Sequence, residues 1–205
     1  MIAATTAVEA VEIPLSERGP SPRKVIVAYG FWLFLLSDII VFAALFAAYA
    51  VLCGRTADGP RGTQLFHRDN VLLETACLLL SSFTCALMSL AIEFRRRDWM
   101  ALAAAMTLAL GAAFVTLELR EFSSMLAHGA GPDRSAFLSA FFALVGLHGL
   151  HVSVGLCWLV AMLAQVLTLG WRPFVLDRLA CFSLFWHALD IVWIGVFTIV
   201  YLGAR

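Results

Sequence analysis

Hydrophobic residues along this chain fall into five long runs, which short polar segments separate. About twenty consecutive apolar residues suffice for a helix to cross the roughly 30 Å hydrocarbon layer, at about 1.5 Å per residue. The pattern therefore predicts an all-α integral membrane bundle of five transmembrane helices. The expected helices cover residues 26–52, 71–93, 99–122, 136–168 and 179–202.

The segments between these runs contain residues that end membrane helices. Glycine, proline and charged residues are concentrated there, and such residues favour turns. Residues 1–24 are also polar, with three prolines and three glutamates, and are expected to form a mobile tail ahead of a membrane domain at 25–205. The predicted breaks are 53–69, Arg95-Arg96-Arg97-Asp98, 128–135 and 170–173.

Lysine and arginine are distributed unevenly between the two predicted sides. If the N-terminus lies in the cytoplasm, eight of these residues are inside and six are outside, and Arg120 is one of the six. The inner set includes three consecutive arginines in a very short loop. Because cytoplasmic loops carry the excess of positive charge, we expect a cytoplasmic N-terminus and an outer C-terminus.

Composition supports a membrane protein and excludes some partners. Of the 205 residues, 62% are hydrophobic and only 14% are charged, whereas soluble domains are about half apolar and a quarter charged. The net charge is zero, so nothing indicates a nucleic-acid partner. The five cysteines lie in or beside apolar runs without a CxxC pair, which favours helix packing over a disulfide or metal site.

Several ionisable residues nevertheless lie inside the apolar runs. A charged group near the centre of a span costs about 2.5 to 3.5 kcal/mol on insertion scales, so each needs a partner or a function. Two clusters are predicted from depth along the helices. The mid-membrane cluster comprises Asp38, His148, His151, His187 and Asp190, and the outer cluster comprises Glu74, Glu118, Arg120 and Glu121.

These polar residues allow more than one interpretation. Paired histidines on neighbouring helices can hold haem iron or copper. The HxxH pair of His148 and His151 lacks a nearby glutamate or cysteine, however, which favours hydrogen bonds between helices over a metal site. Asp38 and Asp190 are interpreted as contacts between helices rather than as a proton path. An independent proton channel or transporter and a haem-bearing anchor remain alternatives.

Three segments of the chain resemble one known family, subunit III of the haem-copper respiratory oxidases. The likeness extends over about residues 26–203, and its most specific strings are HGLHV and WHxxDxVW. Within the family the chain is most similar to the branch in ubiquinol oxidases of the cytochrome bo type, which has five helices. The three segments are WLFLLSDIIVFAALFAAYAVL (32–52), GPDRSAFLSAFFALVGLHGLHVSVGLCW (131–158) and FSLFWHALDIVWIGVFTIVYL (182–202).

The resemblance implies a place in a larger complex. Such a complex oxidises ubiquinol, or cytochrome c in other branches, reduces dioxygen to water and translocates protons across the bacterial cytoplasmic membrane. It implies that this chain has no catalytic residue and no cofactor or metal of its own, and that the haems and copper belong to subunit I. It further implies subunits I, II and IV and membrane phospholipid as partners. In the bacterial cytoplasmic membrane, the outer C-terminus expected from the charge count would be periplasmic.

One residue departs from the pattern of the wider family. Many cytochrome c oxidase relatives have a buried, carbodiimide-reactive glutamate at the position that Asp38 occupies here. Aspartate keeps the carboxyl group but withdraws it by one methylene. The resemblance therefore implies a carboxyl group at this position, but it does not imply a proton-relay role for Asp38.

Overall fold

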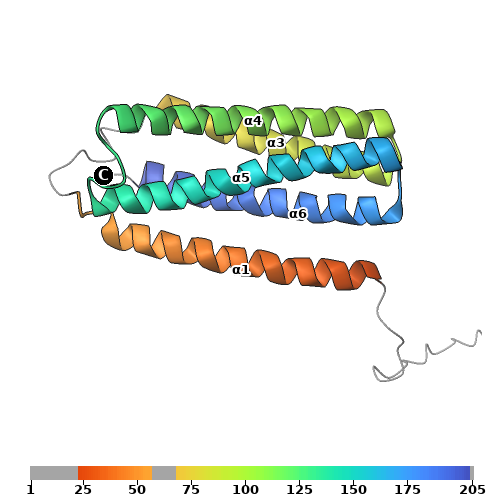
Figure 1. Cartoon of the computed structure of the whole chain (residues 1–205), viewed down its shortest axis with the longest axis horizontal. Helices are drawn as coiled ribbons and strands as arrows, with labels where there is room; N and C mark the ends of the chain where they lie inside the picture. The colour runs from red at the N-terminus through yellow and green to blue at the C-terminus, as the bar shows by residue number, and fades with distance from the viewer. Residues whose placement is uncertain (1–22, 57–67, 204–205) are drawn as a thin grey trace, which may run out of the picture.

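The computed structural model describes residues 23–56 and 68–203, and these ranges contain helices and turns but no strand. Five helices are long and apolar enough to cross a membrane, as the hydrophobic pattern predicted. The last of them continues directly into a short π-helix, η2. The elements are α1 (Arg23–Leu52), α3 (Arg68–Glu93), α4 (Arg97–Ala127), α5 (Ala136–Leu169), α6 (Pro173–Val196) and η2 (Phe197–Leu202) (Figure 1).

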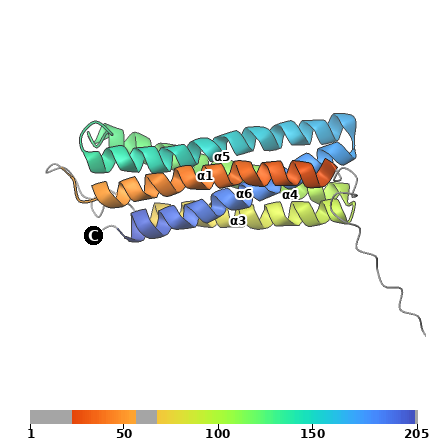
Figure 2. The ribbon, with the colours of Figure 1, turned by 90° about the horizontal axis from the view of Figure 1, so that it is seen from below.

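Successive helices run in opposite directions, so α1 begins at one end of the bundle and η2 finishes at the other (Figure 1). The helices α3, α4, α5 and α6 form a four-helix group, and α1 packs against α5 and α6 on one side of it. Figure 2 shows α1 running along this side for most of the length of the bundle. Within the described residues, α1 therefore contacts the other helices with one face.

Local chemistry explains where the helices begin and end. The helix α6 begins at Pro173 rather than near residue 179, because proline is well suited to the first helical position. The helix α4 continues to Ala127, past the expected end near residue 122, and the chain turns at Gly129 with φ of 71°. Most of the tail expected for 1–24 lies outside the described residues, which begin at residue 23 in α1.

Trp186 lies at the centre of the four-helix group and is fully buried. An added Cβ at Gly111 of α4 would lie 3.0 Å from this indole ring, and one at Gly155 of α5 would lie 2.9 Å from it. Its Nε1 donates a hydrogen bond of 3.1 Å to the Ser81 hydroxyl of α3. The two glycines therefore make room for a tryptophan that holds four helices together.

Candidate functional site

Asp38 and His151 lie beside each other midway along α1 and α5. The distance from Asp38 Oδ2 to His151 Nε2 is 3.8 Å, which is too long for a hydrogen bond. The Nδ1 atom of His151 lies 2.8 Å from the Leu147 carbonyl oxygen, to which it can only donate. The side chains of His151 and Asp38 are 22% and 24% exposed, so the described residues cover the pair only in part.

His148 is completely buried and behaves as an aromatic ring. Its ring centroid lies 5.2 Å from that of Trp193, 5.8 Å from Phe114 and 6.3 Å from Phe42. Neither ring nitrogen has a hydrogen-bond partner among the described residues. His148 therefore contributes packing between helices, and not the hydrogen bond that its sequence position suggested.

His187 and Asp190 meet a residue that the sequence did not single out. The Nδ1 atom of His187 is 2.7 Å from the Ser82 hydroxyl of α3. Asp190, one turn further along α6, interacts with the same hydroxyl and with the His187 ring, while its Oδ1 has no partner within the described ranges. These contacts join α6 to α3, whereas Asp38 and His151 join α1 to α5.

The outer cluster is brought together by the fold, apart from its arginine. Glu118 interacts electrostatically with Glu74 and Glu121, and Glu74 and Glu118 are only 1% and 4% exposed. None of these carboxyl oxygens has a hydrogen-bond partner in the part of the chain that the structure describes. Arg120 is exposed, and it forms no ion pair with the three glutamates in the described part of the chain.

The Glu118 side chain depends on a glycine in the neighbouring helix. A Cβ added at Gly149 of α5 would lie 2.6 Å from both carboxyl oxygens of Glu118. The carboxyl group therefore rests directly against the α5 backbone. Any larger residue at position 149 would force it to move.

A row of hydroxyl groups on α3 makes the largest set of polar contacts between two helices. Each hydroxyl meets a polar group of α6, and we call the row the α3–α6 seam. The sequence analysis missed this row, although hydroxyl residues recurring along an apolar run could have indicated it, because Ser and Thr commonly hydrogen-bond across membrane helices. The seam pairs Thr75 with Trp193, Ser81 with Trp186, Ser82 with His187 and Ser89 with Ser183, at 3.1, 3.1, 2.7 and 3.0 Å.

The hydrogen bonds described above connect neighbouring helices. Among residues 23–56 and 68–203, no three His, Cys, Asp or Glu side chains are grouped so that they could hold a metal ion. The histidines point to different partners and not to one common centre. Of the predicted polar residues, Asp38 and His151 lie beside each other across α1 and α5, and His187 contacts Ser82 across α6 and α3.

Comparison with known proteins places these features in a family. The family model of cytochrome c oxidase subunit III matches residues 21–204. The cytochrome bo(3) ubiquinol oxidase subunit 3 of Pseudomonas aeruginosa is 51% identical over 174 residues, covering 85% of this chain and 83% of that protein. The Pseudomonas putida protein of the same name is 50% identical over 173 residues, covering 84% of each chain. The quinol oxidase subunit 3 of Bacillus subtilis is 42% identical over 176 residues, covering 84% of this chain and 85% of its own.

Proposed function

The chain belongs to the cytochrome c oxidase subunit III family, and we propose that it is the third subunit of a bacterial ubiquinol oxidase of the cytochrome bo type. Such a complex oxidises ubiquinol, reduces dioxygen to water and translocates protons. The observation that carries the proposal is the 51% identity to a protein named as subunit 3 of such an oxidase, over 85% of this chain. Relatives from Pseudomonas and Bacillus are both named for quinol oxidases, which favours quinol over cytochrome c as the electron donor.

The role proposed for this chain is structural. Subunit I would hold the haems and copper, and this chain would stabilise subunit I by helix packing and bound phospholipid, in a complex that also contains subunits II and IV. Its own polar groups support this role, because they join α1 to α5 and α3 to α6. The described residues include no grouping suited to a metal ion.

The partly exposed Asp38–His151 pair supports contact with a neighbouring subunit. Both residues lie midway along helices that are long enough to span the membrane, at the depth of the hydrocarbon. Ionisable groups at this depth almost always face protein or a water-filled cavity. We therefore assign the side of the bundle where α1 meets α5 to contact with another oxidase subunit.

The proposed location is the bacterial inner membrane, with the N-terminus in the cytoplasm and the C-terminus in the periplasm. The support is the odd number of helices long enough to span a membrane, five within the described residues, because an odd number of spans would put α1 and η2 at opposite faces. The loop of Arg95, Arg96 and Arg97 supports the orientation, because positively charged short loops stay inside. A reporter enzyme fused to either terminus tests it, since alkaline phosphatase is active only in the periplasm.

Purification of the tagged chain in mild detergent tests the proposed function. We expect a larger haem-containing partner to co-purify, and the complex to consume oxygen with ubiquinol. Oxygen uptake with cytochrome c and not with quinol would instead indicate a cytochrome c oxidase. A chain that purifies alone and conducts protons in vesicles would refute the oxidase assignment, and stoichiometric haem on the isolated chain would refute the structural role.

A further inference from the structure

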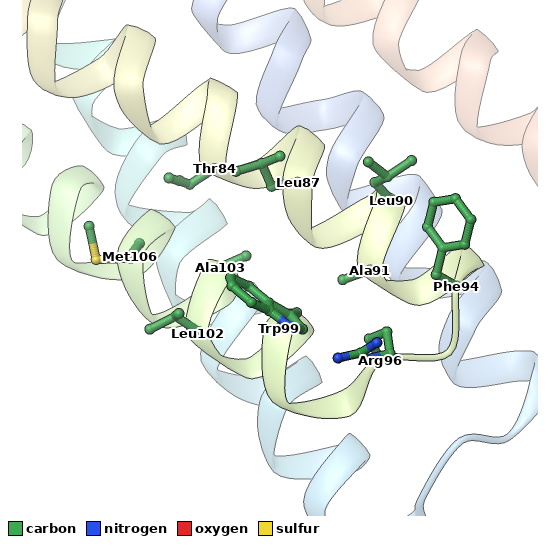
Figure 3. Close-up of a pocket in the computed structure, with 10 residues that line it drawn as sticks. All are labelled: Thr84, Leu87, Leu90, Ala91, Phe94, Arg96, Trp99, Leu102, Ala103 and Met106. Carbon is green, nitrogen blue, oxygen red and sulfur yellow. The ribbon is translucent and has the colours of Figure 1, made fainter.

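A groove of about 600 Å³ lies between α3 and α4, away from the polar contacts described above (Figure 3). Figure 3 shows side chains of both helices facing it along its length. Nine of the ten residues that line it are uncharged, and most are large and apolar. They are Thr84, Leu87, Leu90, Ala91 and Phe94 from α3 and its end, and Arg96, Trp99, Leu102, Ala103 and Met106 from the loop and α4.

The groove extends from one end of the bundle into the depth of the membrane. Between Thr84 and Phe94, ten helical residues rise about 15 Å, which is half the roughly 30 Å hydrocarbon thickness. At its inner end, the Thr84 hydroxyl is bonded to the Thr107 hydroxyl at 2.8 Å. The groove therefore has the length of one leaflet and offers an apolar surface along it.

The end of the groove at the loop between α3 and α4 carries a positive charge, and the loop backbone turns sharply there. Arg95 has φ of 54°, and the Arg96 amide donates a 2.9 Å hydrogen bond to the Ala91 carbonyl, so the chain turns sharply here. Arg97 lies over the Trp171 ring at 5.8 Å, outside the groove. Arg96 is thus the one charged residue among the ten that line the groove, and Figure 3 shows it beside Trp99.

We propose that this groove binds an anionic phospholipid, with an acyl chain along the apolar wall and the phosphate at Arg96. A guanidinium group matches the geometry of phosphate oxygens and binds them more strongly than neutral donors do. Tryptophan is enriched at the boundary between headgroups and hydrocarbon, where Trp99 would lie. An apolar wall with one cation at the headgroup level fits a lipid better than the apolar face of another helix.

The inference deepens the proposed function, which includes bound phospholipid, by assigning one lipid to one site. It places the lipid on the side of the four-helix group away from α1 (Figure 1). The groove and the α1–α5 side are then separate surfaces, one for lipid and one for a protein partner. Loss of this lipid need not release the chain from its complex, so the two proposals can fail independently.

Two pairs of variants in the purified complex test the site. Arg96→Gln removes the charge at the groove, while Arg95→Gln removes a neighbouring charge that does not line it. Met106→Trp fills the groove from a position that is 47% exposed, and Leu119→Trp adds the same ring elsewhere on α4 at a residue that is 58% exposed. Each complex is partly delipidated, titrated with phosphatidylglycerol or phosphatidylcholine, and measured by native mass spectrometry.

We expect the wild-type complex to bind one phosphatidylglycerol that Arg96→Gln binds about tenfold more weakly, as loss of a charged hydrogen bond implies. Met106→Trp should lose this lipid, whereas Arg95→Gln and Leu119→Trp should keep it. Phosphatidylcholine should bind more weakly than phosphatidylglycerol. The site would be overturned if all four variants kept the lipid equally, or if both arginine variants lost it equally. Crosslinks from Leu102→Cys to another subunit would also overturn it. If instead no haem-containing partner co-purified with the wild-type chain, the proposed function would be overturned.

Discussion

Replacing Gly155 by alanine tests whether Trp186 is wedged between helices as tightly as the structure implies. The new methyl group would lie 2.9 Å and 3.2 Å from two carbons of the Trp186 indole and 3.1 Å from the Phe185 ring. Both rings are buried, so neither can swing into open space. One of them must shift, or α5 must move away from α6.

The size of the effect follows from two opposing contributions. Inserting a methyl group into a packed core costs about 1 to 3 kcal/mol. Alanine in place of glycine in a helix interior recovers about 0.5 to 1 kcal/mol. The midpoints of these two ranges differ by about 1 kcal/mol, so we expect Gly155→Ala to destabilise the subunit by that amount and to lower its thermal midpoint by roughly 2 to 4 °C.

Gly146→Ala on the same helix is the matched control. Its added Cβ would lie 3.6 Å from the Phe122 ring, which is an ordinary contact, so only the helix preference should act. The assay is the temperature at which each variant subunit is lost from the detergent-solubilised complex, followed by size-exclusion chromatography after heating. If Gly155→Ala dissociates at the wild-type temperature or above it, the wedge described for Trp186 does not exist.

Four further substitutions, at three positions, address the polar residues within the membrane. Asp38→Asn should keep assembly and most oxidase turnover, whereas Asp38→Leu should weaken assembly by removing the polar partner of His151; loss of proton pumping in an assembled Asn variant would contradict the structural role. His187→Ala should destabilise this subunit by about 0.6 to 1.7 kcal/mol through the lost contact between α6 and Ser82 of α3, and so loosen its hold in the complex without altering the haem spectrum; a shifted Soret band would contradict this. Glu118→Gln should leave the thermal midpoint unchanged or higher, because no described donor stabilises its carboxyl group; a fall of several degrees would show that another subunit supplies a donor.

The spans and the family were predictable because each depends on residues close together in the sequence. A bilayer needs about twenty apolar residues in a row, and strings such as HGLHV lie within one helix. The polar partners were harder to predict, because they depend on how neighbouring helices are rotated. Ser82 meets His187 only because α3 packs against α6, and no spacing within either helix specifies that contact.

The residues of the predicted mid-membrane cluster illustrate the same limit. Asp38 and His151, which were grouped by their position along the helices, lie beside each other midway along α1 and α5. The position of His148 along its helix does not show that its ring faces Phe114 and Trp193. The sequence of one helix does not specify which side chains of other helices surround a residue. The outer glutamates were expected beside Arg120, but that arginine points away from the bundle on the exposed face of α4.

The α3–α6 seam limits how this protein can respond to bilayers of different thickness. A helix that is longer than the hydrocarbon layer usually tilts or slides against its neighbours. Here, sliding α6 by one turn would break all four contacts of the seam together, at a cost of roughly 2 kcal/mol if each contributes about 0.6. In a thin or thick membrane, the surrounding lipid should therefore stretch or compress around a rigid pair of helices.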